Sequence, residues 1–201
     1  MSALEVETPH GRARAHLHAA AGDARGALVL GHGAGGGVGA RDLVAVTAEA
    51  RAAGFAVALV EQPYAVAGRR SAAPAHQLDA AWLAVVERLR AEELAGLPLV
   101  AGGRSSGAHV ACRTAGAAGA AAVLCLAFPV HAPGRPEKSR LAELDAVDVP
   151  VLVVQGDRDP FGMPPPGPRR RVVAVPGTHS FGRDLGPVEA AVGDWLASFP
   201  G

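Results

Sequence analysis

The sequence predicts an α/β fold in which a doubly wound, mostly parallel sheet of about seven to eight strands is flanked by helices. Two observations predict it: short, almost wholly apolar segments that end at glycine, proline or a polar residue, and amphipathic segments between them. A strand buried on both faces produces the first pattern, and a helix that covers a sheet produces the second. Their repeated alternation is typical of a parallel sheet with helices on both sides.

The first element differs from the rest. Residues Leu4 to Leu17 alternate polar and apolar side chains around the pair His10-Gly11. Such alternation about a turn predicts an antiparallel hairpin, which we place at the edge of the sheet. The apolar runs predicted as buried strands follow at 27–30, 55–60, 97–101, 121–128, 149–154 and 171–175. Apolar spacings of three and four predict helices around 43–50, 78–89, 107–117 and 188–199.

Length and composition exclude several classes of protein. The 201 residues suffice for one domain, predicted over 1–201, and a hydrophobic fraction of 49% argues against disorder. Lys+Arg and Asp+Glu number 19 each, so net charge gives no reason to expect a nucleic-acid or anionic-membrane partner. The triplet Arg169-Arg170-Arg171 is interpreted as a solvated loop edge. No apolar run reaches the roughly 18 residues of a membrane helix.

Two further absences shape the expectations. The first ten residues lack the apolar core of a signal peptide, so we expect a cytoplasmic protein. No CxxC, HExxH or acidic loop is present, so neither a metal site nor a cofactor is expected. The spacing of Cys112 and Cys125 does not suggest a disulfide, and two buried thiols in a reducing compartment are expected.

The segment Gly103-Arg104-Ser105-Ser106-Gly107 carries the strongest chemical signal. It matches G-x-S-x-G between a predicted buried strand and a predicted helix. The serine of this motif sits on a turn so tight that the positions two before and two after it must be nearly bare. Ser105 meets that condition, whereas Ser106 has Arg104 and Ala108 there. Ser105 is therefore the predicted nucleophile, at a helix N-terminus that favours an oxyanion.

A glycine-rich loop, Gly31 to Gly37, follows the first buried strand. At that place in the chain, such a loop can turn a backbone N–H toward the nucleophile as a second oxyanion donor. The alternative is a phosphate-binding loop. It lacks the G-K-[ST] ending of a P-loop, and the acidic residue that a dinucleotide site needs about 20 residues on is replaced by the more distant Glu61.

Two later loops supply an acid and a base in the order serine, aspartate, histidine. The strand at 149–154 leads to Asp157 and Asp159, and the strand at 171–175 leads to His179. We assign Asp159 as the acid, with Asp157 as the alternative acid or a loop stabiliser. His179 is the only histidine after residue 131, so it is the predicted base that takes the proton of Ser105.

Four further residues are assigned to substrate binding. His32 lies in the glycine-rich loop, where the alternative is that it braces the oxyanion loop. His131 lies near the expected mouth of the site, where the alternative is an ordinary surface position. Tyr64 and Arg104 are assigned near the substrate without a closer placement. His109, one helical turn after Ser105, is expected only to pack there.

The motifs together resemble the α/β-hydrolase superfamily in its dienelactone-hydrolase-like part. More narrowly, they resemble the small hydrolases typified by testis-expressed protein thirty. The matching segments run in order along essentially the whole chain: 31–36, 102–107, 128–138, 156–162 and 179–181. The resemblance implies a Ser105, Asp159, His179 triad, with the N–H groups of Ala34 and Ser106 forming the oxyanion hole. Residues 129–149 are too few for a separate lid domain.

The expected function is therefore a serine hydrolase. It would cleave a small carboxylic ester or thioester, a small-molecule substrate, through an acyl-enzyme intermediate. The alternative is a non-catalytic binding or scaffold protein that retains the hydrolase fold, since a fold alone does not establish a function. The sequence does not predict an oligomeric state.

Overall fold

The computed structural model describes residues 2–199, in which eight strands and six helices are found. The strands are β1 (Ser2–Thr8), β2 (Gly11–His18), β3 (Gly26–Gly31), β4 (Phe55–Glu61), β5 (Leu99–Arg104), β6 (Ala122–Leu126), β7 (Val151–Gly156) and β8 (Arg170–Val175). The helices are α1 (Arg41–Ala52), α2 (Pro63–Val66), α3 (Ala75–Ala91), α4 (Ser106–Ala118), α5 (Leu141–Asp145) and α6 (Gly186–Ala197).

The eight strands join one sheet in the order β1-β2-β4-β3-β5-β6-β7-β8. Strands β3 to β8 run parallel, while β1 and β2 form an antiparallel hairpin whose second strand pairs with β4. Thr8 pairs with Gly11 at the turn of that hairpin. The predicted mostly parallel sheet and the predicted edge hairpin are both confirmed.

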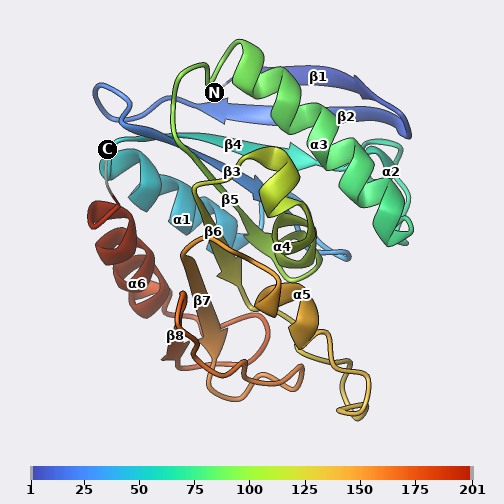
Figure 1. Cartoon of the computed structure of the whole chain (residues 1–201), viewed down its shortest axis with the longest axis vertical. Coiled ribbons are helices and arrows are strands. Elements are labelled where there is room, and N and C mark those ends of the chain that lie inside the picture. The colour runs from blue at the N-terminus through green and yellow to red at the C-terminus, as the bar shows by residue number, and fades with distance from the viewer. Residues whose placement is uncertain (1, 200–201) are drawn as a thin grey trace.

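Helices cover both faces of this sheet (Figure 1). On one face, α3, α4 and α5 pack over a core that contains Trp82 and Phe128. On the other face, α1 and α6 pack over a second core that contains Leu43 and Phe55. All residues of β3 and β7 are buried, because the strands of this sheet have helices on both sides. This double burial explains why the sequence shows apolar runs rather than alternation.

The connection between β6 and β7 holds only the five-residue helix α5. The predicted absence of a separate lid is therefore confirmed for residues 2–199. The short helices α2 and α5 were not predicted, because four or five residues are too few to show a helical period. None of the helices in this part of the chain is both long and apolar enough to cross a bilayer.

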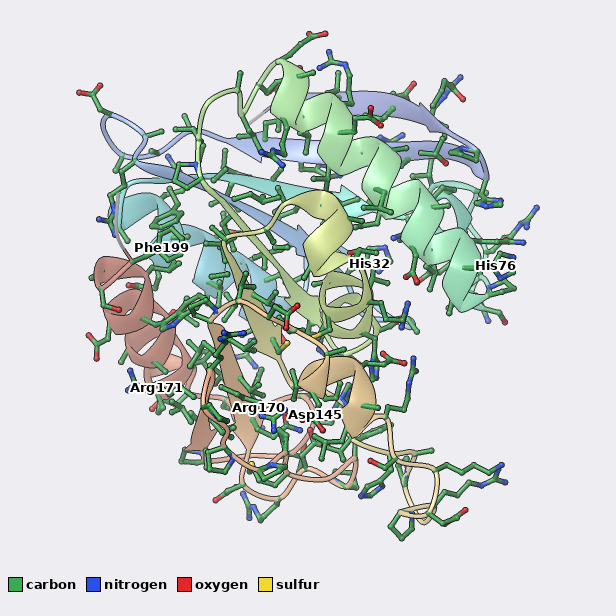
Figure 2. All side chains as sticks on the ribbon, viewed as in Figure 1. His32, His76, Asp145, Arg170, Arg171 and Phe199 are labelled. Carbon is green, nitrogen blue, oxygen red and sulfur yellow. The ribbon has the colours of Figure 1, made fainter. Side chains whose placement is uncertain are left out.

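The arginine triplet differs from the expectation of a solvated loop edge. Arg170 begins β8, and its side chain is only 10% exposed because the guanidinium pairs with Asp145 on α5 at 2.8 Å and donates to the Pro165 carbonyl. Figure 2 shows Asp145 and Arg170 beside one another. Arg169 and Arg171 are exposed, as expected, but the interpretation as a loop edge is wrong for Arg170 and Arg171, which lie in β8.

The two cysteines are buried and reduced, as the sequence analysis expected. Cys112 lies on α4 and Cys125 on β6, and their sulfur atoms are 3.5 Å apart. The fold thus brings together two residues whose spacing in the sequence gave no sign of it.

Candidate active site

The predicted site residues gather at the carboxyl ends of the parallel strands. The chain passes from β3 to its neighbour β4 on one side, and β5 pairs with β3 on the other side. The segments that follow β3 and β5 therefore lead to helices on opposite faces of the sheet, α1 and α4 (Figure 1). A crevice forms where the direction of strand order changes in this way, and ligands of open α/β sheets bind there.

Ser105 occupies the turn between β5 and α4. Its backbone has φ 54° and ψ −112°, a conformation that is costly for a residue with a side chain. The turn is tight enough to exclude side chains on both sides of it. A Cβ on Gly103 would lie 2.5 Å from the carbonyl carbon of Gly107, and one on Gly107 would overlap the carbonyl of Gly31. The spacing of glycines in the motif is thus a consequence of backbone packing.

His179 lies in the loop after β8 and bridges Ser105 to Asp159. Its Nδ1–H donates to Asp159 Oδ2 at 2.8 Å, and its Nε2 accepts from the Ser105 hydroxyl at 2.8 Å. The Asp159 side chain is 1% exposed and that of His179 is 15% exposed. The ring of Phe161 packs on the imidazole with 4.2 Å between centroids. The arrangement orients the imidazole so that Nε2 is free to accept a proton from serine.

Two neutral donors hold the Asp159 carboxylate. Gln155 Nε2 donates to Oδ2 at 2.8 Å, and the backbone N–H of Phe161 donates to Oδ1 at 2.9 Å. Gln155 is fully buried in β7, and its amide also reaches the carbonyls of Phe128 and Gly162. Gln155 was not predicted from the sequence, where its one sign is a single polar residue near the end of an otherwise apolar strand.

Asp157, the alternative acid, does not contact His179. Its Oδ1 accepts from the backbone N–H of Gly177 at 2.9 Å. Asp157 therefore joins the loop after β7 to the loop after β8, which is the stabilising role that the sequence analysis gave as its alternative.

The candidate oxyanion donors lie on the two sides of the crevice. Ser106 is the first residue of α4, and Ala34 is in the exposed turn of the glycine-rich loop. Within residues 2–199, neither N–H donates to another protein group. Unpaired N–H groups at a helix N-terminus and in an exposed loop are available to an incoming oxyanion.

His32 and Tyr64 form hydrogen bonds to main-chain carbonyls of the glycine-rich loop. His32 is buried, its Nδ1–H donates to the Gly33 carbonyl at 2.8 Å, and its Nε2 accepts from the backbone N–H of Gln62 at 3.2 Å. Burial lowers the pKa of this histidine, which favours the neutral ring that these bonds require. The Tyr64 hydroxyl donates to the Ala34 carbonyl at 3.2 Å. Both side chains therefore contact the loop itself, and His32 fits the bracing alternative.

A cavity of about 490 Å³ lies beside His179, between the glycine-rich loop and the start of α1. Its walls include Gly33, Arg41, Arg104 and Ser180, and no aliphatic side chain larger than alanine. A second cavity of about 500 Å³ lies between the β1–β2 turn, α2 and α3, and Tyr64 lines this one instead. Of the residues assigned to substrate binding, only Arg104 thus lines the cavity that reaches His179.

His131 lies on the other side of the site, in the connection after β6. Its backbone N–H donates to the Phe161 carbonyl at 3.1 Å, and its ring packs near Gly162. It does not line the cavity beside His179. The structure therefore links His131 to the loop that carries Asp159, while its assignment to substrate stays a prediction.

Comparison with known proteins agrees with this fold. A family model described as an alpha/beta hydrolase domain matches residues 24–166, which is more than half of the chain. The chain therefore belongs to the alpha/beta-hydrolase family. No curated protein matches the sequence. The narrower resemblance to the testis-expressed branch has no support in these comparisons and stays a prediction.

Solved structures extend the similarity to the whole chain. An α/β serine hydrolase without a lid from Xanthomonas campestris superimposes with a TM-score of 0.77 at 21% identity, covering 99% of this chain and 96% of that one. A dienelactone hydrolase from Anabaena variabilis gives 0.75 at 17% identity, with 97% and 95% covered. The esterase domain of a Rhodothermus marinus protein gives 0.72 at 13% identity, with 98% and 97% covered. These similarities establish the fold, and the family supports a hydrolase activity.

Proposed function

We propose that this protein is a serine hydrolase that cleaves small carboxylic esters or thioesters through an acyl-enzyme intermediate. The observation that carries the proposal is the continuous hydrogen-bonded chain from Ser105 through His179 to the buried Asp159, with 2.8 Å at each step. Nucleophile, base and orienting acid in this geometry are what acyl transfer to a serine requires.

The proposed reaction proceeds in two halves. As Ser105 Oγ attacks the substrate carbonyl carbon, its proton passes to His179 Nε2, and Asp159 stabilises the imidazolium. The carbonyl oxygen gains negative charge, which the N–H groups of Ala34 and Ser106 stabilise. Collapse of the tetrahedral intermediate breaks the bond to the leaving group, which takes the proton from His179. A water molecule, deprotonated by the same histidine, then releases the acid and restores Ser105.

The walls of the adjacent cavity support the choice of a small substrate. Glycine, alanine and polar or charged side chains line it, so it offers no large aliphatic side chain against which a long acyl chain could pack. The connection between β6 and β7 carries no lid that could enclose such a chain. These two features favour an acyl group of a few carbons that is reached directly from solvent.

Labelling with a fluorophosphonate tests the nucleophile. The labelled fraction of the wild-type protein is expected to increase with time, whereas Ser105→Ala is expected not to be labelled. Ser71→Ala, which removes an exposed hydroxyl elsewhere, is the matched control and should label like wild type. Hydrolysis of p-nitrophenyl acetate and of an acetyl thioester should follow the same pattern. A wild-type protein that neither labels nor turns over any ester would instead favour the binding or scaffold alternative.

A further inference from the structure

The residue directly before the nucleophile contacts the loop that carries the base. Arg104 ends β5, and its Nη2 donates to the main-chain carbonyl of His179 at 3.1 Å and lies 3.4 Å from Ser180 Oγ. Ser105 and His179 are therefore connected twice, once through their own side chains and once through this guanidinium.

The guanidinium of Arg104 is in turn hydrogen-bonded to Asp42. Arg104 Nε donates to Asp42 Oδ2 at 3.2 Å, while Asp42 Oδ1 accepts from the backbone N–H of Leu43 at 2.9 Å. Asp42 lies in the first turn of α1, and its side chain is 7% exposed. A carboxylate fixed in this way leaves the guanidinium one orientation, and the pairing keeps the charge beside the active site balanced.

The remaining side of the guanidinium packs on the glycine-rich loop. A Cβ on Gly33 would lie 3.0 Å from Arg104 Nη1. Arg104 thus fills the space where the glycine-rich loop, α1, the serine turn and the histidine loop meet. A planar group with donors on three sides can connect all four segments, which a lysine ammonium at the end of a flexible chain cannot do.

The histidine loop has a second tie to the same turn of α1. Arg41 Nη2 donates to the Arg183 carbonyl at 2.5 Å. The loop lies between β8 and α6, where Phe181 adopts a positive φ of 58°. Residues outside helices and strands depend on such contacts for a fixed position, because they have no ladder of backbone hydrogen bonds.

From these contacts we propose that Arg104, oriented by Asp42, is a positioning residue that holds the main chain of His179 so that Nε2 stays within reach of Ser105 Oγ. This inference rests on the proposed function and goes beyond the substrate contact assigned to Arg104 from sequence. Two edges of the guanidinium are hydrogen-bonded to Asp42 and to the loop that carries His179, so these donors are engaged within the protein.

The variants Arg104→Ala, Arg104→Lys and Asp42→Asn test the inference, with kcat and KM measured separately on p-nitrophenyl acetate. Arg104→Ala is expected to lower kcat about 10- to 100-fold, the range for a misplacement of about 1 Å, while KM changes by less than about threefold. Arg104→Lys should recover little of the loss, and Asp42→Asn should fall between Arg104→Ala and wild type.

Arg113→Ala is the matched control. Arg113 is an equally buried arginine, with its side chain 19% exposed against 18% for Arg104, and it also pairs with a carboxylate, that of Asp79. It lies on α4 away from His179, so its loss is expected to lower the unfolding midpoint without changing kcat. Free guanidinium ion at tens of millimolar should restore part of the kcat of Arg104→Ala, whereas sodium should not. General destabilisation would be worsened by guanidinium.

Two outcomes would overturn the inference. In the first, Arg104→Ala retains the wild-type kcat, or raises KM alone, which would return Arg104 to substrate binding. In the second, kcat of Arg104→Ala falls only as far as its stability falls, with no rescue by guanidinium. An inactive wild-type protein would instead refute the proposed function, so the two failures are distinguishable.

Discussion

Two histidine–carboxylate pairs in this protein are almost alike in geometry and differ in everything around them. His179 donates to Asp159 at 2.8 Å, and His109 on α4 donates to Glu143 on α5 at 2.9 Å. Each imidazole also packs on a phenylalanine ring, with centroids 4.2 Å apart in the first pair and 4.4 Å apart in the second. The hydrogen bond and the ring contact therefore cannot by themselves define a catalytic base.

The first difference lies at the other ring nitrogen. Nε2 of His179 accepts from the Ser105 hydroxyl, whereas Nε2 of His109 is buried and has no partner within residues 2–199. The side chain of His109 is 4% exposed, and burial lowers its pKa. His109 therefore packs in the interior, as was predicted, and in addition bonds to Glu143, which was not predicted.

The second difference lies in what holds each carboxylate. Glu143 accepts from the guanidinium groups of Arg113 and Arg140 as well as from His109. Asp159 accepts from the neutral amide of Gln155 and from a backbone N–H. Neutral donors orient a carboxylate while leaving its charge to stabilise an adjacent imidazolium, whereas two guanidinium groups already compensate that charge. The environment of Asp159 suits a base, and that of Glu143 suits a structural ion network.

Replacing each histidine by asparagine is expected to separate the two pairs most strongly. His179→Asn should lower kcat for ester hydrolysis by about 10⁴-fold or more, because the base and its proton are lost together. His109→Asn should keep kcat within about twofold and lower the unfolding midpoint, because a buried ring and one hydrogen bond are lost. Steady-state kinetics and thermal unfolding of both variants provide the measurement.

The comparison fails if His109→Asn loses activity as severely as His179→Asn while remaining folded. That result would assign His109 a part in the reaction through α4, whose first residues follow the nucleophile. Fluorophosphonate labelling of Ser105 in both variants distinguishes a lost nucleophile from a lost fold.

The same contrast explains which parts of the fold and of the candidate site could be predicted from the sequence. Ser105, Asp159 and His179 were predicted because each follows an apolar run, in a fixed order along the chain. The structure places the three side chains within hydrogen-bond distance. The parallel sheet was predictable for the same reason, since burial on both faces leaves a strong local signature. Neither prediction required knowledge of contacts between distant segments.

Asp42 and Gln155, which contact Arg104 and Asp159, have a weaker signature in the sequence. Asp42 precedes Ser105 by many residues and reaches Arg104 only because α1 and β5 meet at the crevice. Gln155 reads in the sequence as the end of a strand, and its contact with Asp159 depends on how the following loop returns toward β7. Local pattern predicts the candidate catalytic residues, while the residues that contact them are brought there by packing between elements remote in sequence.

Gln155→Met is expected to have a smaller effect than loss of the base. The substitution conserves side-chain volume but removes the amide that donates to Asp159 Oδ2, which leaves that oxygen with His179 as its one remaining side-chain donor. We expect kcat to fall about 10-fold, in keeping with the loss of an orienting partner, with KM nearly unchanged. Steady-state kinetics together with an unfolding curve measure this. A Gln155→Met protein with full kcat would show that the Phe161 N–H and His179 are enough to orient the acid.

The smallest expected effect is a pH dependence of stability that belongs to the second pair. Burial raises the pKa of Glu143, but hydrogen bonds and charges from His109 and Arg140 outweigh it and lower the pKa to about 2, below its ordinary 4.5. Because the pKa of Glu143 is lower in the folded protein, its ionised carboxylate stabilises the fold above pH 4.5. This stabilisation is lost as the pH falls toward 2 and the carboxylate is protonated. Urea unfolding should show Glu143→Gln less stable than wild type by about 1 kcal/mol at pH 7, after allowance for solvent screening, with the gap narrowing as the pH falls from 4.5 toward 2. Glu137→Gln, at an exposed loop position, is the matched control, and a gap for Glu143→Gln that stays constant from pH 7 to 3 would contradict the ionic role of Glu143.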